Sequence, residues 1–240
     1  MEFPDLLRLI DERATAFQAA VAAAPGLDAP VPSCPGWTLD DLVRHLADGR
    51  RKWASIVAAG PAGAPPPQPD EPADFAEATR QLLAALRETG PDQGCWGWWG
   101  DSPQSPLTAG AAARHQLQEI AVHTYDAQLA AGDPQPLPTE VALDGVEEFL
   151  VTCVATTAPW PHAPATVDYR TTEGPAWRLD LSAEGARAER LSTFGEAAAS
   201  AEASASDLVL IFYGRVPLTT AKLDGDTGVF DQLIAWDPSA

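Results

Sequence analysis

The spacing of apolar residues predicts four amphipathic helices in the first half of the chain. In residues 3–24, Leu6, Ile10, Phe17 and Val21 follow one another at intervals of four or seven, which places them on one helix face. Comparable stripes recur in residues 38–57, 73–89 and 108–131. Four such helices joined by polar or proline-rich loops are typical of an antiparallel bundle.

Local signals mark the ends of these helices. Pro25 and Gly26 follow the first helix, and Thr38 with Asp41 three residues later forms a capping box at the start of the second. Gly132 is a natural stop for the fourth helix. Residues 60–72 hold too many prolines for a helix or a strand, so we expect an exposed, partly extended connection there.

The pattern changes after residues 133–138, which are rich in proline. One more helical stretch, 141–157, precedes two β-like runs at 165–172 and 176–182. A helical pattern at 204–214 and a mixed tail at 218–236 complete the chain. We therefore predict an α+β fold class, with an N-terminal four-helix bundle over residues 1–137 and a small α+β domain over residues 138–240.

Charge and composition exclude several partners. The chain has 15 Lys and Arg against 34 Asp and Glu, a formal net charge of −19, so phosphate backbones and anionic membranes would be repelled. We expect no nucleic-acid partner. No apolar run approaches the roughly 20 residues of a membrane span, and the first segment carries acids where a signal peptide needs basic residues, so we expect a cytoplasmic protein.

The cysteines offer little chemistry on sequence grounds. Cys34, Cys95 and Cys153 are an odd number, are widely spaced and include no CxxC pair, so neither a disulfide framework nor a zinc ribbon is indicated. Nothing near Cys34 in the sequence supplies a base that would activate it. We interpret all three as packed or idle thiols.

Three other side chains form a candidate metal site. His45 falls on the inward stripe of the second predicted helix, among apolar neighbours. Glu119 and His123 are four residues apart on the fourth, which separates them by about 6 Å along one helix face. An ion held by only three protein ligands keeps a position open for water or a substrate thiol, as catalytic sites do.

The choice of ligands on the fourth helix is contested by His115. It lies eight residues, or roughly 12 Å of helix axis, from His123, so the two histidines are not expected to share one ion. Asp126 favours the pair Glu119 and His123, because a carboxylate three residues on can hold the imidazole N–H. The residues alone leave ordinary roles open, since a histidine on an apolar stripe is often a packed core residue.

Two further clusters have alternative interpretations. The tryptophans in the loop before the fourth helix either wall a substrate pocket or pack the end of the bundle, and the same applies to Trp37; they are Trp96, Trp98 and Trp99. The densest basic cluster is expected to be mostly a solvated helix face; it consists of Arg44, Arg50, Arg51 and Lys52.

Three blocks of the sequence resemble a known family. VPSCPGWTLDDLVRHLADGRRKWA at 31–54 and RHQLQEIAVHTYDAQLAAG at 114–132 are similar to the maleylpyruvate isomerase family of mycothiol-dependent enzymes, whose N-terminal part is a DinB-like four-helix bundle. ASASDLVLIFYGRVPL at 203–218, followed by LDGD, is similar to the small C-terminal domain of that family. The resemblance covers nearly the whole chain.

The resemblance implies roles for particular residues. His45, Glu119 and His123 match the positions at which the family holds a divalent metal, usually zinc, and Asp126 matches the acid that follows the second histidine. Arg215 matches an arginine of the C-terminal domain that reaches over the metal cleft toward the substrate, and that domain is expected to cover the cleft. Where many members have Arg or Lys and then Trp between that histidine and the acid, this chain has Thr124 and Tyr125, so contacts at the metal rim are expected to differ.

The expected function is an activated thiol attacking a small electrophilic substrate. The resemblance supplies mycothiol as the thiol cofactor, and the enzyme would be an isomerase of the maleylpyruvate type or a thiol S-transferase. Two alternatives remain: a bundle that binds or sequesters a small molecule without turnover, and a hydrolase that uses a metal-bound water. The sequence specifies neither the substrate nor the oligomeric state.

Overall fold

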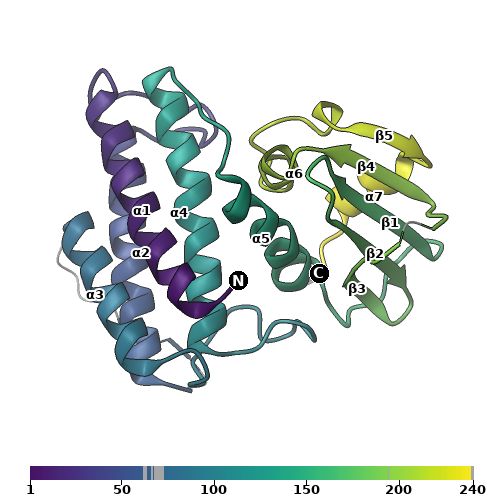
Figure 1. Ribbon diagram of the computed structural model, residues 1–240, viewed down its shortest axis with the longest axis horizontal. Coiled ribbons are helices and arrows are strands. Elements are labelled where there is room, and N and C mark those ends of the chain that lie inside the picture. The colour runs from purple at the N-terminus through teal and green to yellow at the C-terminus, as the bar shows by residue number, and fades with distance from the viewer. Residues whose placement is uncertain (62–63, 66, 68–72, 194, 239–240) are drawn as a thin grey trace. The chain divides into compact units, whose positions relative to one another are not determined.

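The computed structural model describes residues 1–61, 64–65, 67, 73–193 and 195–238. In the first half, four helices pack side by side: α1 (Phe3–Ala23), α2 (Leu39–Ala59), α3 (Phe75–Thr89) and α4 (Ala109–Ala131) (Figure 1). Helix α1 packs mainly on α4 and α2 mainly on α3, while α4 also contacts α2. The predicted four-helix architecture is confirmed. The extended connection predicted at 60–72 falls mostly on residues outside those described.

The predicted signals set the ends of the two helices that carry the candidate ligands. Thr38 and Asp41 form the complete capping box: the Asp41 N–H donates to Thr38 Oγ1 at 3.3 Å, and the Thr38 N–H donates to Asp41 Oδ2 at 2.9 Å. Gly132 ends α4 in the left-handed conformation, with φ of 81°, which glycine adopts without a steric penalty. The capping box thus marks where α2 begins, and Gly132 marks where α4 ends.

The second half is a mixed sheet with helices. Helix α5 (Thr139–Phe149) continues into a π-helical turn (Leu150–Val154). The sheet has the strand order β3-β2-β1-β4-β5, in which β1 and β4 are parallel and the other pairs antiparallel. Its strands and later helices are β1 (Ala165–Thr171), β2 (Ala176–Ser182), β3 (Gly185–Arg190), β4 (Ala199–Ala203), α6 (Ala205–Phe212), β5 (Lys222–Gly225) and α7 (Gly228–Ala235). The α+β prediction is confirmed, although the sequence pattern located only β1 and β2 among the strands.

One face of this sheet is apolar and covered by helices. Tyr169 on β1 lies directly opposite Trp177 on β2, and the alternation along β2 turns Leu179 to the same side. The Tyr169 ring contacts Phe212 of α6 at 4.9 Å and Phe230 of α7 at 6.2 Å between centroids. The helices therefore cover this face.

The opposite face carries ionic pairs. Asp168 is fully buried, and its carboxylate accepts hydrogen bonds from Arg178 Nε at 2.7 Å and Arg178 Nη2 at 3.1 Å. Arg170 Nη2 donates to the same carboxylate at 3.2 Å. Alternation along the strands thus separates the charged groups of β1 and β2 from the apolar face that supports the helices.

The chain forms two compact units. The first consists of Met1–Trp98 with Leu107–Leu137, and the second of Trp99–Pro106 with Pro138–Ala240. The segment 99–106 is tied into the second unit by Gln104, whose side chain donates to Ala188 O and accepts from Ala188 N, both at 2.7 Å. None of the helices in the described part of the chain combines the length and apolar character that crossing a bilayer requires.

Candidate metal centre

The first unit brings His45, Glu119 and His123 together. Each offers one ligand atom, and the three atoms all lie within 4.8 Å of one another. His45 Nε2 on α2 is 3.0 Å from Glu119 Oε1 on α4, and His123 Nε2 is 3.7 Å from the same oxygen. Two imidazole nitrogens and one carboxylate oxygen match the donors that zinc binds in catalytic sites, so the residues fit a divalent ion.

The carboxylate of Glu119 is charged in this setting. Burial alone would raise its pKa, but the hydrogen bond with His45 and the charges of the nearby histidines outweigh burial and lower the pKa to about 2. The side chains of His45 and Glu119 remain 40% and 30% exposed, whereas His123 is 12% exposed. The Glu119 carboxylate is therefore in its ligating form, and His45 and Glu119 can be reached from solvent.

Asp126 orients the His123 ring through a hydrogen bond to Nδ1. Its carboxylate is fully buried and accepts from His123 Nδ1 at 2.8 Å and from the Ser33 hydroxyl at 2.6 Å. Because a carboxylate only accepts, the ring proton resides on Nδ1 and the Nε2 lone pair is left for an ion. The arrangement also ties the loop before α2 to α4.

Cys34 is a third donor near the Asp126 carboxylate. Its Sγ lies 3.7 Å from Asp126 Oδ2, so the fold supplies the acceptor that the neighbouring sequence lacks. Cys34, His123 and Asp126 form a second group with metal-binding geometry. We favour the first group, His45, Glu119 and His123, for two reasons. The Asp126 carboxylate already accepts from three donors, and His123 Nδ1 is hydrogen-bonded to Asp126 and so is not directed at an ion.

Aromatic rings lie beside His45 and beside His115. The Trp37 ring lies 5.0 Å from the His45 ring between centroids, which places this tryptophan beside a candidate ligand. His115 lies against Trp53 and Trp98, at 6.2 and 5.4 Å, and is not a member of the ligand group. His115 therefore lies outside the group of candidate ligands, and the choice of Glu119 with His123 stays a prediction.

The tryptophans of the loop before α4 differ in their surroundings and burial. Trp96 lies 6.3 Å from Trp53 between ring centroids, and Trp98 is half exposed. Trp99, which belongs to the second unit, is buried.

Thr124, the residue after His123, is buried. Its hydroxyl donates to Ile120 O at 2.6 Å, so this side chain is held by a hydrogen bond within its own helix.

Arg50 departs from the solvated basic face expected of its cluster. Only 1% of it is exposed, and its guanidinium lies 5.1 Å from the centre of the Phe75 ring. Nε and Nη1 have no hydrogen-bond partner within the described part of the chain. Burial lowers its pKa to about 10, while the charges of Glu119 and Asp11 raise it, so it stays cationic at neutral pH. The signal was available, because Arg50 lies four residues after Leu46 on the inward stripe.

Arg215 belongs to the second unit. It follows α6, and its Nη1 donates to Tyr213 O at 2.7 Å. Its role over the metal cleft, and the covering role of the C-terminal domain, remain predictions.

Replacing a ligand should distinguish the two candidate groups. In His45→Ala we expect binding of Zn²⁺ to weaken by more than the roughly 100-fold typical of losing an outer partner, because one of three donors is gone. Cys34→Ser should leave metal content unchanged. Chelator competition on the purified variants measures both. The opposite pattern, with Cys34→Ser losing the ion and His45→Ala keeping it, would assign the ion to the second group.

Asp126→Asn tests the orientation of His123. The amide keeps the shape but loses the charge that holds the Nδ1 proton, so we expect Zn²⁺ affinity to fall by about 10- to 100-fold. Asp133→Asn, at an exposed position just beyond α4, is the matched control and should bind as the wild type. Equal affinities in the two variants would show that Asp126 serves packing alone.

Comparisons with known proteins agree with this architecture. The sequence model of the mycothiol maleylpyruvate isomerase N-terminal domain matches residues 7–128, and that of the corresponding C-terminal domain matches residues 140–232. No curated protein matched the chain. The crystal structures of a mycothiol-dependent maleylpyruvate isomerase and of a histidine-to-alanine mutant of it each superpose with a TM-score of 0.57 at 12% identity, covering 93% of both chains. That likeness establishes the fold, and the two domain matches show that the chain belongs to the mycothiol maleylpyruvate isomerase family.

Proposed function

We propose that this protein is a metal- and mycothiol-dependent enzyme that activates a thiol for addition to a small electrophilic substrate. The observation that carries the proposal is the convergence of His45 Nε2, Glu119 Oε1 and His123 Nε2, with His123 Nδ1 occupied by Asp126. Membership of the family supports mycothiol as the thiol.

The three ligands would hold a divalent ion, with zinc the best match to two imidazoles and a carboxylate, and would leave one position open. A divalent ion in such a site lowers the pKa of a coordinating thiol far below the value of about 8.5 for a free one, which supplies thiolate at neutral pH. Glu119 contributes the negative charge of the ligand set, and Asp126 keeps His123 in the tautomer that presents Nε2.

Access to the site differs among its members. His45 and Glu119 face solvent more than His123 does, so a thiol and a substrate would approach from the side of His45. Trp37 lies against the His45 ring and would form one wall of that approach. In this proposal Arg215 binds a carboxylate of the substrate, for which a guanidinium offers two parallel donors.

The first chemical step is the same for both proposed activities. The sulfur lone pair forms a carbon–sulfur bond at one carbon of an activated double bond, and the π electrons of that double bond move onto the adjoining electron-withdrawing group. If the adduct rotates about the new single bond and then expels the thiolate, the double bond re-forms with the other geometry, and the enzyme is an isomerase. If the carbon–sulfur bond persists and a proton is taken up, the enzyme is an S-transferase.

The decisive experiment observes the thiol directly, without knowledge of the substrate. Protein loaded with Co²⁺ in place of Zn²⁺ should develop a thiolate-to-metal charge-transfer band when mycothiol is added. The band requires the sulfur to enter the open position, so mycothiol disulfide, which has no thiol, should produce none. His123→Ala should lose the band together with the metal.

Turnover then separates the possible activities. The Zn²⁺-loaded protein is incubated with mycothiol and either maleylpyruvate or a panel of electrophiles that carry an activated double bond. Mass spectrometry then distinguishes isomer from conjugate. Absence of the cobalt band would contradict a thiol-dependent role. Turnover of ester or amide substrates that persists with no thiol present would identify a hydrolase instead.

Arg215→Gln tests the proposed carboxylate contact. Loss of a charged hydrogen bond, worth about 1.5–3 kcal/mol, should raise KM for a carboxylate-bearing electrophile by about 10- to 100-fold, with metal content unchanged. The methyl ester of the same electrophile should be insensitive. Arg187→Gln, at an exposed position on β3, is the matched control. A lowered kcat with unchanged KM would contradict a substrate-binding role.

A further inference from the structure

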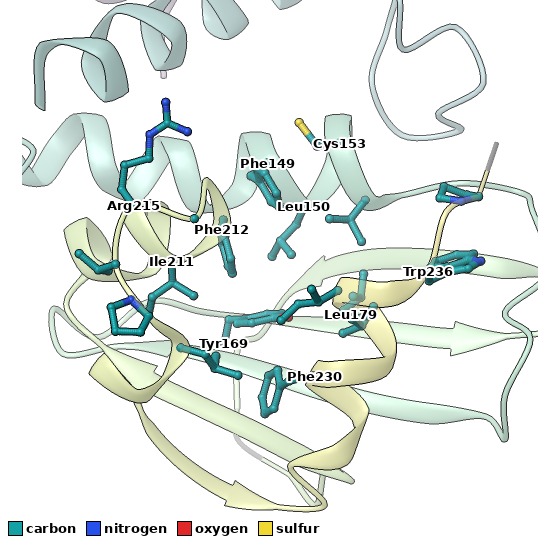
Figure 2. Close-up of a pocket in the computed structure, with 18 residues that line it drawn as sticks. Phe149, Leu150, Cys153, Tyr169, Leu179, Ile211, Phe212, Arg215, Phe230 and Trp236 are labelled. Atoms are coloured by element: carbon teal, nitrogen blue, oxygen red, sulfur yellow. The ribbon is translucent and has the colours of Figure 1, made fainter. Parts of the chain in front are cut away.

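The second unit contains a cavity of its own. Its volume is about 730 Å³, within the range of roughly 300–1,000 Å³ found for small-molecule sites. Side chains from four directions surround it: Phe149 and Leu150 at the end of α5, Tyr169 and Leu179 from the sheet, Phe212 from α6 and Phe230 from α7 (Figure 2). No ligand of the candidate metal centre is among the lining residues.

Aromatic contacts fix the wall of this cavity. Phe149 and Phe212 stack with ring centroids 4.9 Å apart and an interplanar angle of 16°. The Tyr169 ring meets Phe212 edge-on at 4.9 Å and reaches Phe230 at 6.2 Å. Because each ring is held by another, the cavity has a defined shape before any ligand enters.

Among the residues that the structure describes, the lining includes a single charged one. This is Arg215, and Figure 2 shows its guanidinium directed away from Tyr169 and Phe230, with only the stem of the side chain at the cavity. Nη1 of this guanidinium donates to Tyr213 O at 2.7 Å. Burial raises the pKa of both Cys153 and Tyr169, so the thiol and the phenol are neutral at physiological pH. The charged pairs of β1 and β2 lie on the opposite face of the sheet.

One side of the cavity is open to solvent. Ile234, at the end of α7, lines the cavity and is 76% exposed, and Trp236 follows it in the tail. An isoleucine exposed to this extent at a rim of apolar side chains offers an entry route for a hydrophobic molecule. The volume, the fixed aromatic wall and the open side together are typical of a binding site rather than of a packing defect.

We propose that the second unit binds an uncharged, hydrophobic small molecule in this cavity, independently of the metal and of the thiol. A charged ligand would lose its hydration against the rings of this lining, because the guanidinium of Arg215 points away from them. A cavity of about 150 Å³ accepts one benzene ring, so a ligand of roughly two to four rings, or an aliphatic chain of similar bulk, matches this volume. The inference goes beyond the proposed enzyme activity, because it uses none of the metal ligands.

A matched pair of fluorescent probes tests the proposal. N-phenyl-1-naphthylamine is neutral, and 8-anilino-1-naphthalenesulfonate has the same ring system with one negative charge. Titrated into the Zn²⁺-loaded protein, the neutral probe should bind saturably at one site, at least about tenfold more tightly than the sulfonate. Removing the metal with a chelator should leave the binding of the neutral probe unchanged.

Substitution locates the probe in the cavity. Ile211→Trp places a larger side chain into the space from α6 and should weaken binding of the neutral probe at least tenfold; Val154→Phe, from the π-helical turn, should do the same by an independent route. Leu27→Trp, at an exposed position of the first unit, is the control and should bind as the wild type. Circular dichroism and thermal unfolding verify that each variant is folded.

Four outcomes would overturn the proposal. These are no saturable binding of the neutral probe, equal or tighter binding of the sulfonate, loss of binding when the metal is removed, and full binding in both folded cavity variants. None of them bears on the cobalt band that tests the enzyme activity, so the two proposals can fail separately.

Discussion

The hydrogen bond between Asp126 and His123 is the interaction on which the candidate site depends. A buried carboxylate would be costly without partners, and here it accepts from a ring nitrogen, a hydroxyl and a thiol. The same contacts join the loop that carries Ser33 and Cys34 to α4, and that loop leads directly into α2. By holding the proton on Nδ1, Asp126 turns the other nitrogen of His123 toward Glu119 and, beyond it, toward His45 on the facing helix.

Two further charged side chains of the bundle, Glu119 and Arg50, lie on the two helices that carry the candidate ligands. Glu119 is kept ionised by its histidine neighbours, and Arg50 stays cationic although it is buried among apolar side chains. The Glu119 charge raises the pKa of Arg50, which partly offsets the cost of its burial. The two helices that supply the ligands are therefore linked by charge as well as by packing, and an ion in the site would add to an arrangement of opposite charges that already exists.

The second unit separates charged and apolar groups by strand alternation. Asp168 and Arg178 occupy one face of the sheet, and Tyr169 and Leu179 the other, where the helices cover them without filling the space. The two units thus offer different chemistry: a polar centre suited to a metal and a thiol, and an apolar cavity suited to a neutral molecule. The second of these has no counterpart among the motifs that the sequence displays.

Features that depend on near neighbours could be predicted from the amino-acid sequence. The stripe spacing predicted the four helices, Thr38 with Asp41 predicted the start of α2, and the four-residue step from Glu119 to His123 placed two candidate ligands on one face. Contacts between distant segments became visible only in the folded chain. Strands β3, β4 and β5 are short and hold few strongly β-forming residues, so pairing rather than propensity defines them. Cys34 lies 92 positions from the carboxylate it meets, and the cavity is enclosed by residues from 149 to 238. Such contacts follow from how helices and strands pack, and no local pattern encodes them.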